Sequence, residues 1–89
     1  MSPKAAAKDA AATAQRFDRE VDVRGYTCPI PALRARVALQ RMDSGQVLRV
    51  VSDDPGSVQD FRNFGRSTGH RLVHHAASGR DFVFYFRKA

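Results

Sequence analysis

The stretch GYTCPIP, residues 25–31, organises this chain because it joins a strand-like run to a helical pattern. Before it, Val21 and Val23 alternate with charged residues, which is the period of a half-buried strand. After it, alanine and leucine recur at helical spacing among arginines. Pro29 and Pro31 suit a first helical turn, because the N–H that proline lacks would have no partner within the helix there. The stretch therefore predicts a turn from a strand into a helix.

Cys28, the only cysteine of the chain, lies in this turn and is expected near the N-cap of the helix. Unpaired N–H groups and the positive end of the helix dipole favour a negative group there, so the thiolate should form more readily than in a free cysteine. A lone cysteine is more commonly a small buried apolar residue. A turn that follows Gly25 is a poor place to bury one, so we predict a reactive thiol.

The length and composition fit one small domain. The chain has 89 residues, of which 43% are hydrophobic, and this is enough for one modest core and no second one. A single cysteine excludes an intramolecular disulfide and favours a reducing compartment. The sequence contains no run of membrane-spanning length and no continuous apolar segment of a signal peptide. We therefore expect a cytoplasmic monomer without a membrane segment.

The net charge of +6 raises nucleic acid as a partner, because clustered Lys and Arg bind phosphates. The basic residues here are scattered rather than clustered, so we expect a generally basic surface and no direct nucleic-acid binding. Arg34 and Arg41 lie one heptad apart and share a face of the first predicted helix. That face is either a solvated flank or a basic rim for a partner.

The hydrophobic pattern predicts the order strand, helix, strand, helix, strand, strand after an Ala-rich tail. Residues 1–19 offer too little apolar surface to offset their ordering entropy, so we expect a disordered tail there and one domain over residues 20–89. The expected strands cover residues 20–24, 46–52, 70–76 and 81–87, and the expected helices cover residues 29–42 and 55–68.

Each predicted helix has an apolar stripe that should face the sheet. The first stripe consists of Ala32, Ala35, Leu39 and Met42. Val58 and Phe61 anchor the second helix, which Asp54 should cap, with Pro55 as its first residue. In the last strand three phenylalanines alternate with Val83 and Tyr85, and we expect the phenylalanine face to pack under the helices; they are Phe82, Phe84 and Phe86.

Two other sets of polar residues are explained more simply by structural roles than by metal binding or catalysis. His70, His74 and His75 could ligate a metal, but neighbouring strand residues point to opposite faces, so His74 and His75 cannot easily converge on one ion. His70 and His74 are expected to share a solvated face. Asp53 and Asp54 could act as an acid–base pair, but capping of the second helix explains them. We expect no metal site and no cofactor.

A single cysteine limits the reactions that this chain could carry out. Hydrolysis would need a histidine and an oxyanion site in a cleft, which so small a domain can hardly build. Without a second cysteine, thiol–disulfide exchange within one chain is excluded. What remains is a thiolate that attacks an electrophilic sulfur, holds it as a persulfide and passes it on. This would be a sulfurtransferase-type relay rather than a stand-alone turnover enzyme.

Several motifs in fixed order carry a family resemblance. They are Gly25-x-x-Cys28-Pro29-x-Pro31 after a Val-Asp-Val strand, Met42-Asp-Ser-Gly45, and Asp53-Asp54-Pro55 after a β-branched strand. Together they resemble the TusA family of sulfur-carrier proteins, also called the SirA-like family, over roughly residues 21–88. The resemblance implies an α+β fold: a two-layer α/β sandwich of order βαβαββ, with a four-stranded mixed sheet and two helices on one face.

The resemblance also implies a function. Cys28 would accept persulfide sulfur from a cysteine desulfurase or a rhodanese-like donor and relay it to an acceptor protein. Routes in the family lead to tRNA thiolation, sulfur oxidation and molybdenum-cofactor maturation.

Individual residues of this chain match positions of the family pattern. Cys28 matches the sulfur-bearing cysteine, and Gly25, Pro29 and Pro31 belong to the motif around it.

Arg36 and Asp54 fall on positions that contact the sulfur donor in the family's best-known member, and we assign Arg34 to the same partner surface. Ile30 stands where that member has an acidic residue, and Gly65 where it has a second cysteine.

The alternative is a non-catalytic protein- or RNA-binding regulatory module on the same fold. It predicts that Cys28→Ser leaves function intact, whereas charge reversal at Arg34 and Arg41 abolishes it. A sulfur carrier predicts the opposite order of effects.

Overall fold

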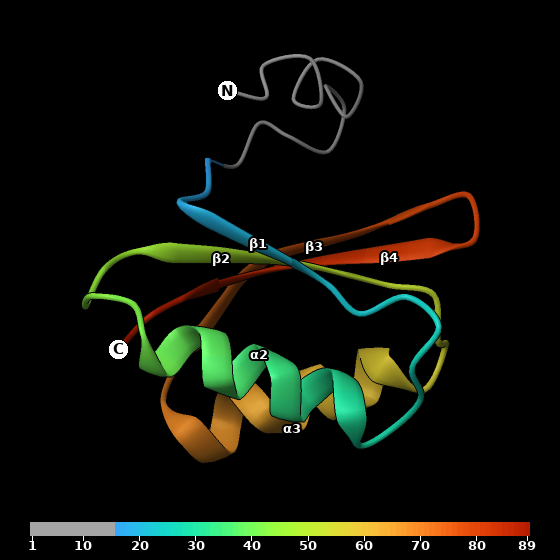
Figure 1. Cartoon of the computed structure of the whole chain (residues 1–89), viewed down its shortest axis with the longest axis horizontal. Coiled ribbons are helices and arrows are strands. Elements are labelled where there is room, and N and C mark those ends of the chain that lie inside the picture. Colours follow the sequence, from blue (N-terminus) through green and yellow to red (C-terminus); the bar gives the residue numbers. More distant parts are fainter. Residues whose placement is uncertain (1–15) are drawn as a thin grey trace.

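The computed structural model describes residues 16–89, which form one sheet with both helices on one of its faces (Figure 1). The elements are β1 (Arg19–Asp22), α2 (Ile30–Gln40), β2 (Val47–Ser52), α3 (Ser57–Thr68), β3 (Arg71–Ser78) and β4 (Asp81–Arg87). This confirms the expected order of elements and the two-layer α+β architecture. Most of the expected tail, residues 1–15, lies outside the described residues.

The sheet is mixed, with the strand order β1-β2-β4-β3. β1 runs parallel to β2, while β4 pairs antiparallel with β2 on one side and with β3 on the other. The register places Val21 of β1 beside Val50 of β2, and Val50 beside Phe84 of β4. Because β1 and β2 are parallel and each leads into a helix, both strand-to-helix turns lie at the same end of the sheet, where the two strands have their carboxyl ends.

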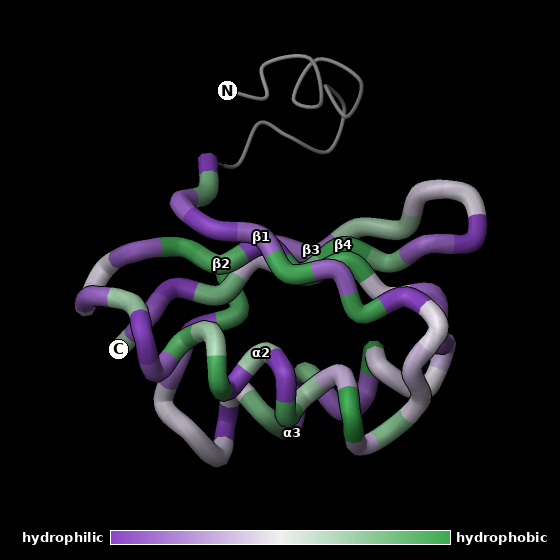
Figure 2. The backbone as a smooth tube through the Cα atoms, viewed as in Figure 1, coloured by the Kyte–Doolittle hydropathy of each residue, from purple (hydrophilic) through white to green (hydrophobic). Residues whose placement is uncertain are grey.

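The main core lies between the sheet and the helices. Phe84 and Phe86 of β4 face this side, as expected, and the ring of Phe61 from α3 lies 4.7 Å and 5.6 Å from theirs. Phe64, which the sequence-based stripe left out, is also buried there. Figure 2 shows the hydrophobic residues concentrated on the central strands β2 and β4. The first predicted stripe is buried as expected through Ala35 and Leu39 of α2 and through Met42, which follows the helix.

The opposite face of the sheet has its own small apolar cluster, built on Tyr85, Val83 and Val47. Arg49 crosses this face with 7% of its surface exposed, donates a hydrogen bond to the Tyr85 hydroxyl at 3.1 Å and forms an ion pair with Glu20. An aromatic ring from the end of the expected tail also takes part, since Phe17 lies 6.2 Å from the Tyr85 ring. Ordered contacts therefore begin before residue 20.

The predicted start of the second helix was wrong. α3 begins at Ser57 with Gly56 as its N-cap, so Asp54 does not cap the helix and Pro55 is not its first residue. The Asp54 carbonyl accepts hydrogen bonds from the N–H and the hydroxyl of Ser57, which forms a turn before the helix. The carboxylate of Asp54 instead accepts hydrogen bonds from the N–H groups of Cys28 and Gly56.

The histidines are distributed differently from the expectation. A register shift in β3 between Leu72 and His74 adds a residue to the strand. His70 therefore packs on Phe64 of the main core, whereas His74 lies beside Tyr85 on the opposite face, so the two do not share a face. His75 stacks on Phe84, which confirms that His74 and His75 point to opposite faces.

Candidate functional site

The turn between β1 and α2 carries Cys28, which is exposed. The cysteine lies two residues before the first residue of α2, and the Cys28–Pro29 peptide bond is cis. Pro29 is the N-cap residue of this helix, and Pro31 is fully buried, so the second proline anchors the start of α2 in the core. Gly25 has a φ of 89°, the left-handed region that favours glycine. The motif residues therefore shape and anchor the turn that presents the thiol.

Two carboxylates from the end of β2 hold this turn in place. The N–H of Gly25 donates to Asp53 Oδ1 at 3.0 Å, and the N–H of Cys28 donates to Asp54 Oδ2 at 3.3 Å. The other oxygen of Asp54 accepts the N–H of Gly56 at 3.3 Å. Sequence reasoning explained both aspartates as caps of α3 and missed this role. The signal was the parallel pairing of β1 and β2, which brings their carboxyl ends together.

A third carboxylate acts on the thiol. Hydrogen bonding to Asp60, in the first turn of α3, is the largest cause that raises the pKa of the Cys28 thiol, followed by desolvation and by the charges of Asp60 and Asp54. The expected lowering of the thiol pKa by the α2 dipole is therefore wrong. The physical reason is that these carboxylates disfavour the negatively charged thiolate.

The two arginines assigned to a partner surface lie on different sides of α2. Arg34 is exposed and its guanidinium lies 4.4 Å from the centre of the Tyr26 ring, next to the cysteine turn. Arg36 is also exposed but borders a depression of about 340 Å³ between α2 and α3. Asp54 lies under the turn itself. The structure thus brings Asp54 to Cys28 and separates Arg34 from Arg36.

Gly65 lies where α3 passes close to β3 and β4. A Cβ atom at this position would lie 3.3 Å from the carbonyl oxygen of His70 and 3.6 Å from the ring of Phe86. A larger residue would therefore require the carbonyl of His70 to move by a few tenths of an ångström.

Between residues 16 and 89, no three side chains of His, Cys, Asp or Glu lie close enough together to hold a metal ion. Neither helix of this part of the chain is long and apolar enough to cross a membrane.

The chain is similar to known proteins of one family. Residues 19–88 match the family described as sulfurtransferase TusA. This chain belongs to the TusA family. It is 47% identical over 73 residues to the sulfur carrier protein TusA of Allochromatium vinosum, a match that covers 82% of this chain and 96% of that protein.

Other relatives support the same membership. The putative sulfur carrier protein YrkI of Bacillus subtilis is 32% identical over 73 residues, covering 82% of this TusA family member and 97% of the relative. A crystal structure of a SirA-like protein from Desulfitobacterium hafniense has a TM-score of 0.69 at 24% identity, and the match covers 79% of this chain and 96% of that one. At that identity the likeness concerns the fold alone, and it confirms the SirA-like fold expected from the sequence.

Proposed function

We propose that this chain is a sulfur carrier in which Cys28 accepts persulfide sulfur from a donor protein and relays it to an acceptor protein. The observation that carries the proposal is the setting of Cys28: an exposed thiol on a turn whose backbone is fixed by Asp53 and Asp54. Membership of the TusA family and likeness to proteins named as sulfur carriers support the same conclusion.

The first transfer moves one sulfur atom without net oxidation or reduction. The Cys28 sulfur attacks the outer sulfur of a donor persulfide, R–S–SH, and a new sulfur–sulfur bond forms. The bond between the two donor sulfurs breaks, and its electron pair leaves on the donor thiolate. The thiol proton passes to the carboxylate of Asp60, which raises the pKa of the thiol, and then to the leaving thiolate. The second transfer repeats this attack, with an acceptor thiolate as the nucleophile and Cys28 as the leaving group.

Asp60 has two effects on Cys28 in this scheme, one in the resting protein and one during sulfur transfer. The raised thiol pKa protects the resting cysteine, because the thiolate is the form that oxidants and electrophiles attack. Docking of a donor would exclude water from the exposed sulfur, so the proton needs an acceptor on the protein. Asp60, which has the largest effect on the pKa of the thiol, is assigned this role.

Partner recognition is assigned to the surface around the turn. Asp54 links the position of Cys28 to the start of α3, so a partner that moves one of these segments also moves the other. Arg34 and Arg36 flank α2 on its two sides and offer positive charge to a donor or an acceptor. We propose a cysteine desulfurase or a rhodanese-like protein as the donor. The acceptor belongs to tRNA thiolation, sulfur oxidation or molybdenum-cofactor maturation.

The experiment is to incubate the full chain with a cysteine desulfurase and cysteine, and then to measure its intact mass without a reducing agent. The expected product is the chain plus the mass of one sulfur atom. The matched control, Cys28→Ser, should remain at its unmodified mass. A chain that gains no sulfur from any desulfurase or rhodanese-like donor would overturn the proposal, as would an equal gain by the serine variant.

A further inference from the structure

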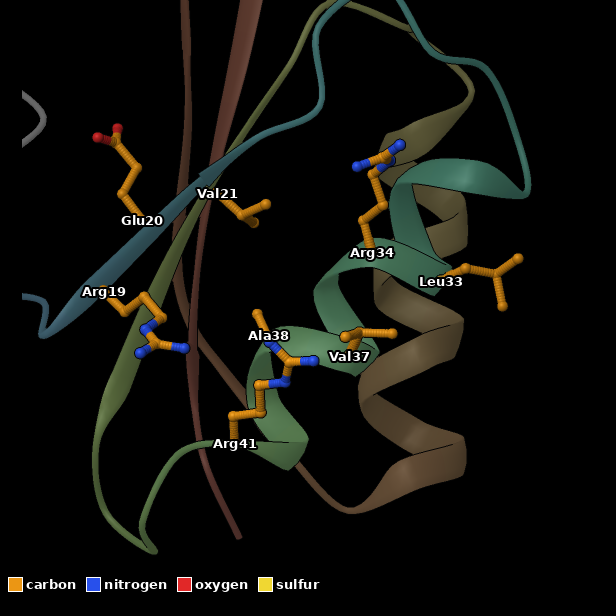
Figure 3. Close-up of a pocket in the computed structure, with 8 residues that line it drawn as sticks. All are labelled: Arg19, Glu20, Val21, Leu33, Arg34, Val37, Ala38 and Arg41. Carbon is orange, nitrogen blue, oxygen red and sulfur yellow. The ribbon is translucent and has the colours of Figure 1, made fainter.

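A groove of about 530 Å³ runs between β1 and α2, on the side of α2 that faces away from α3 (Figure 3). Its apolar lining comes from Val21 of β1 and from Leu33, Val37 and Ala38 of α2. Leu33 and Val37 are each 50% exposed, which is a large fraction for side chains one helical turn apart. The volume falls within the range of about 300–1,000 Å³ typical of ligand sites.

The charged lining of the groove is basic. Arg19 lies at one side on β1, and Arg34 and Arg41 lie at the two ends of the α2 face. None of these three arginines pairs with a carboxylate among residues 16–89. Glu20 also borders the groove, but its side chain projects to the other side of β1 in Figure 3 and pairs with Arg49 on the far face of the sheet. The groove therefore presents positive charge around an apolar floor.

The strand beside the groove is at the edge of the sheet. The sheet order begins with β1, which pairs with β2 on one side and with no other described strand. An edge strand presents a row of N–H and C=O groups that can pair with an added strand. An extended peptide that binds in this way gains main-chain hydrogen bonds, while pockets for alternate side chains give specificity.

We propose that this groove binds an extended, acidic segment of a partner protein, which adds as a strand to the free edge of β1. Alternate residues of the added strand would face α2, so the segment should have the pattern acidic–x–apolar–x–acidic. The apolar residue would cover Leu33 and Val37, and the two acidic residues would meet the arginines at the ends.

The spacing of the arginines fits this pattern. Two residues four apart on a strand are separated by about 13 Å, from a rise of about 3.3 Å per residue. Arg34 and Arg41 are seven residues apart on a helix, which corresponds to about 10 Å along its axis at about 1.5 Å per residue. Flexible arginine side chains readily span the difference.

Charge and lining distinguish this partner from other occupants. A second copy of this chain carries a net charge of +6 and would be repelled. Residues 1–15 of the same chain contain Lys4, Lys8 and Asp9, a net excess of positive charge. A nucleic acid would use the arginines but would leave the apolar floor and the strand edge unused. An acidic peptide with a central apolar side chain matches all three features.

The probe is the peptide acetyl-Thr-Glu-Thr-Leu-Thr-Glu-Thr-amide, titrated into the ¹⁵N-labelled full chain and followed by amide chemical shifts. We expect saturable shifts confined to β1 and α2, and an affinity that falls with added salt, because the contacts are between exposed charges. A control peptide with lysine in place of both glutamates should cause no shifts.

Matched variants test the charge and the apolar floor separately. The double variant Arg34→Glu/Arg41→Glu should weaken peptide affinity about tenfold or more. Arg62→Glu/Arg66→Glu, which changes the net charge equally on the exposed surface of α3, should weaken it less than about twofold. Val37→Asp, at a half-exposed position, should abolish binding and serves as the second test should the double variant fail to fold.

The titration has clear contrary outcomes. The absence of shifts at millimolar peptide, or shifts that map to α3, would overturn the proposal. So would tighter binding of single-stranded oligouridine than of the peptide at the same residues. The proposal does not use the thiol, so the Cys28→Ser chain should bind the peptide as the natural chain does. Failure of sulfur loading and failure of this binding are therefore separate results.

Discussion

The Asp54 carboxylate accepts a hydrogen bond from the backbone N–H of Cys28 at 3.3 Å, although the two residues are 26 positions apart in the sequence. Its other oxygen accepts the N–H of Gly56 at the start of α3. One side chain thus joins the cysteine turn to the beginning of the second helix. Asp60, which raises the pKa of the thiol, lies in the first turn of that helix, so the same link joins the cysteine turn to the segment that carries Asp60.

Removal of this link should cost both stability and sulfur loading. Asp54→Ala leaves two N–H groups without their acceptor, and we expect a loss of about 1–2 kcal/mol in the free energy of unfolding. Urea denaturation measures this loss, and the rate of sulfur loading should fall with it. Asp54→Asn retains one acceptor oxygen and should lose less of both. Equal losses for the two variants would contradict the role given to the hydrogen bonds.

Replacement of Asp60 should make the thiol more acidic. Asp60→Asn removes the carboxylate whose hydrogen bond and charge raise the pKa of Cys28, so the pKa should fall. Ultraviolet absorbance of the thiolate against pH measures the pKa, and alkylation by iodoacetamide at neutral pH should become faster. Asp43→Asn, at an exposed site at the other end of α2, is the matched control and should change neither. An unchanged or higher pKa in Asp60→Asn would contradict this effect of Asp60.

The same variant separates protection from transfer. If Asp60 accepts the thiol proton during sulfur transfer, Asp60→Asn should react faster with small alkylating reagents but load sulfur more slowly from a docked donor. Faster loading would mean that Asp60 only suppresses the thiolate and plays no part in the transfer.

His70 should make stability depend on pH in the mildly acidic range. Burial, together with the charge of Lys88, lowers the pKa of His70 below its ordinary value of 6.5, and its Nδ1 accepts the N–H of Ala89 at 3.1 Å. The stabilisation from the neutral imidazole is complete above pH 6.5 and is lost as the pH falls through the lowered pKa of the folded chain. The urea midpoint should therefore decrease between about pH 7 and about pH 5. His70→Asn, which keeps an acceptor that does not titrate in this range, should show a flatter profile, and an identical slope would exclude His70 as the cause.

Lys88 closes the end of α2. Its ammonium group donates hydrogen bonds to the carbonyl oxygens of Leu39 at 3.0 Å and Met42 at 3.1 Å, where the negative end of the helix dipole lies. Lys88→Met keeps the aliphatic stem but loses these bonds, and we expect a loss of about 1–3 kcal/mol in the free energy of unfolding. The neighbouring exposed Arg87→Met is the control, and a comparable loss there would show that the effect is not specific to the helix end.

The sequence was sufficient for features that depend on periodicity. The alternation of phenylalanine with Val83 and Tyr85 identified the strand face that packs under the helices, because side chains alternate on a strand whatever surrounds it. The same reasoning failed at the histidines, since a single extra residue in β3 moves His74 to the face opposite the one expected.

The site was predictable only in part, because its chemistry comes from contacts between distant segments. Local pattern placed Cys28 correctly on a strand-to-helix turn. It could not show that Asp54 binds this turn or that Asp60 affects the thiol, because their local context is equally explained by a helix start. The predicted direction of the shift in the thiol pKa was therefore wrong. The dipole of α2 is a local effect, whereas the carboxylates that oppose the thiolate come from the next strand and helix.

The central claim is that Cys28 both holds sulfur and gives it up. The most direct measurement is to load the full chain with a desulfurase and cysteine, remove the donor by gel filtration, and add cyanide. Cyanide takes the outer sulfur of a persulfide as thiocyanate and leaves the cysteine as thiolate. The account predicts one thiocyanate per loaded chain, return of the chain to its original mass, and none from Cys28→Ser. Thiocyanate released equally by the serine variant, or sulfur that stays on the chain, would contradict it.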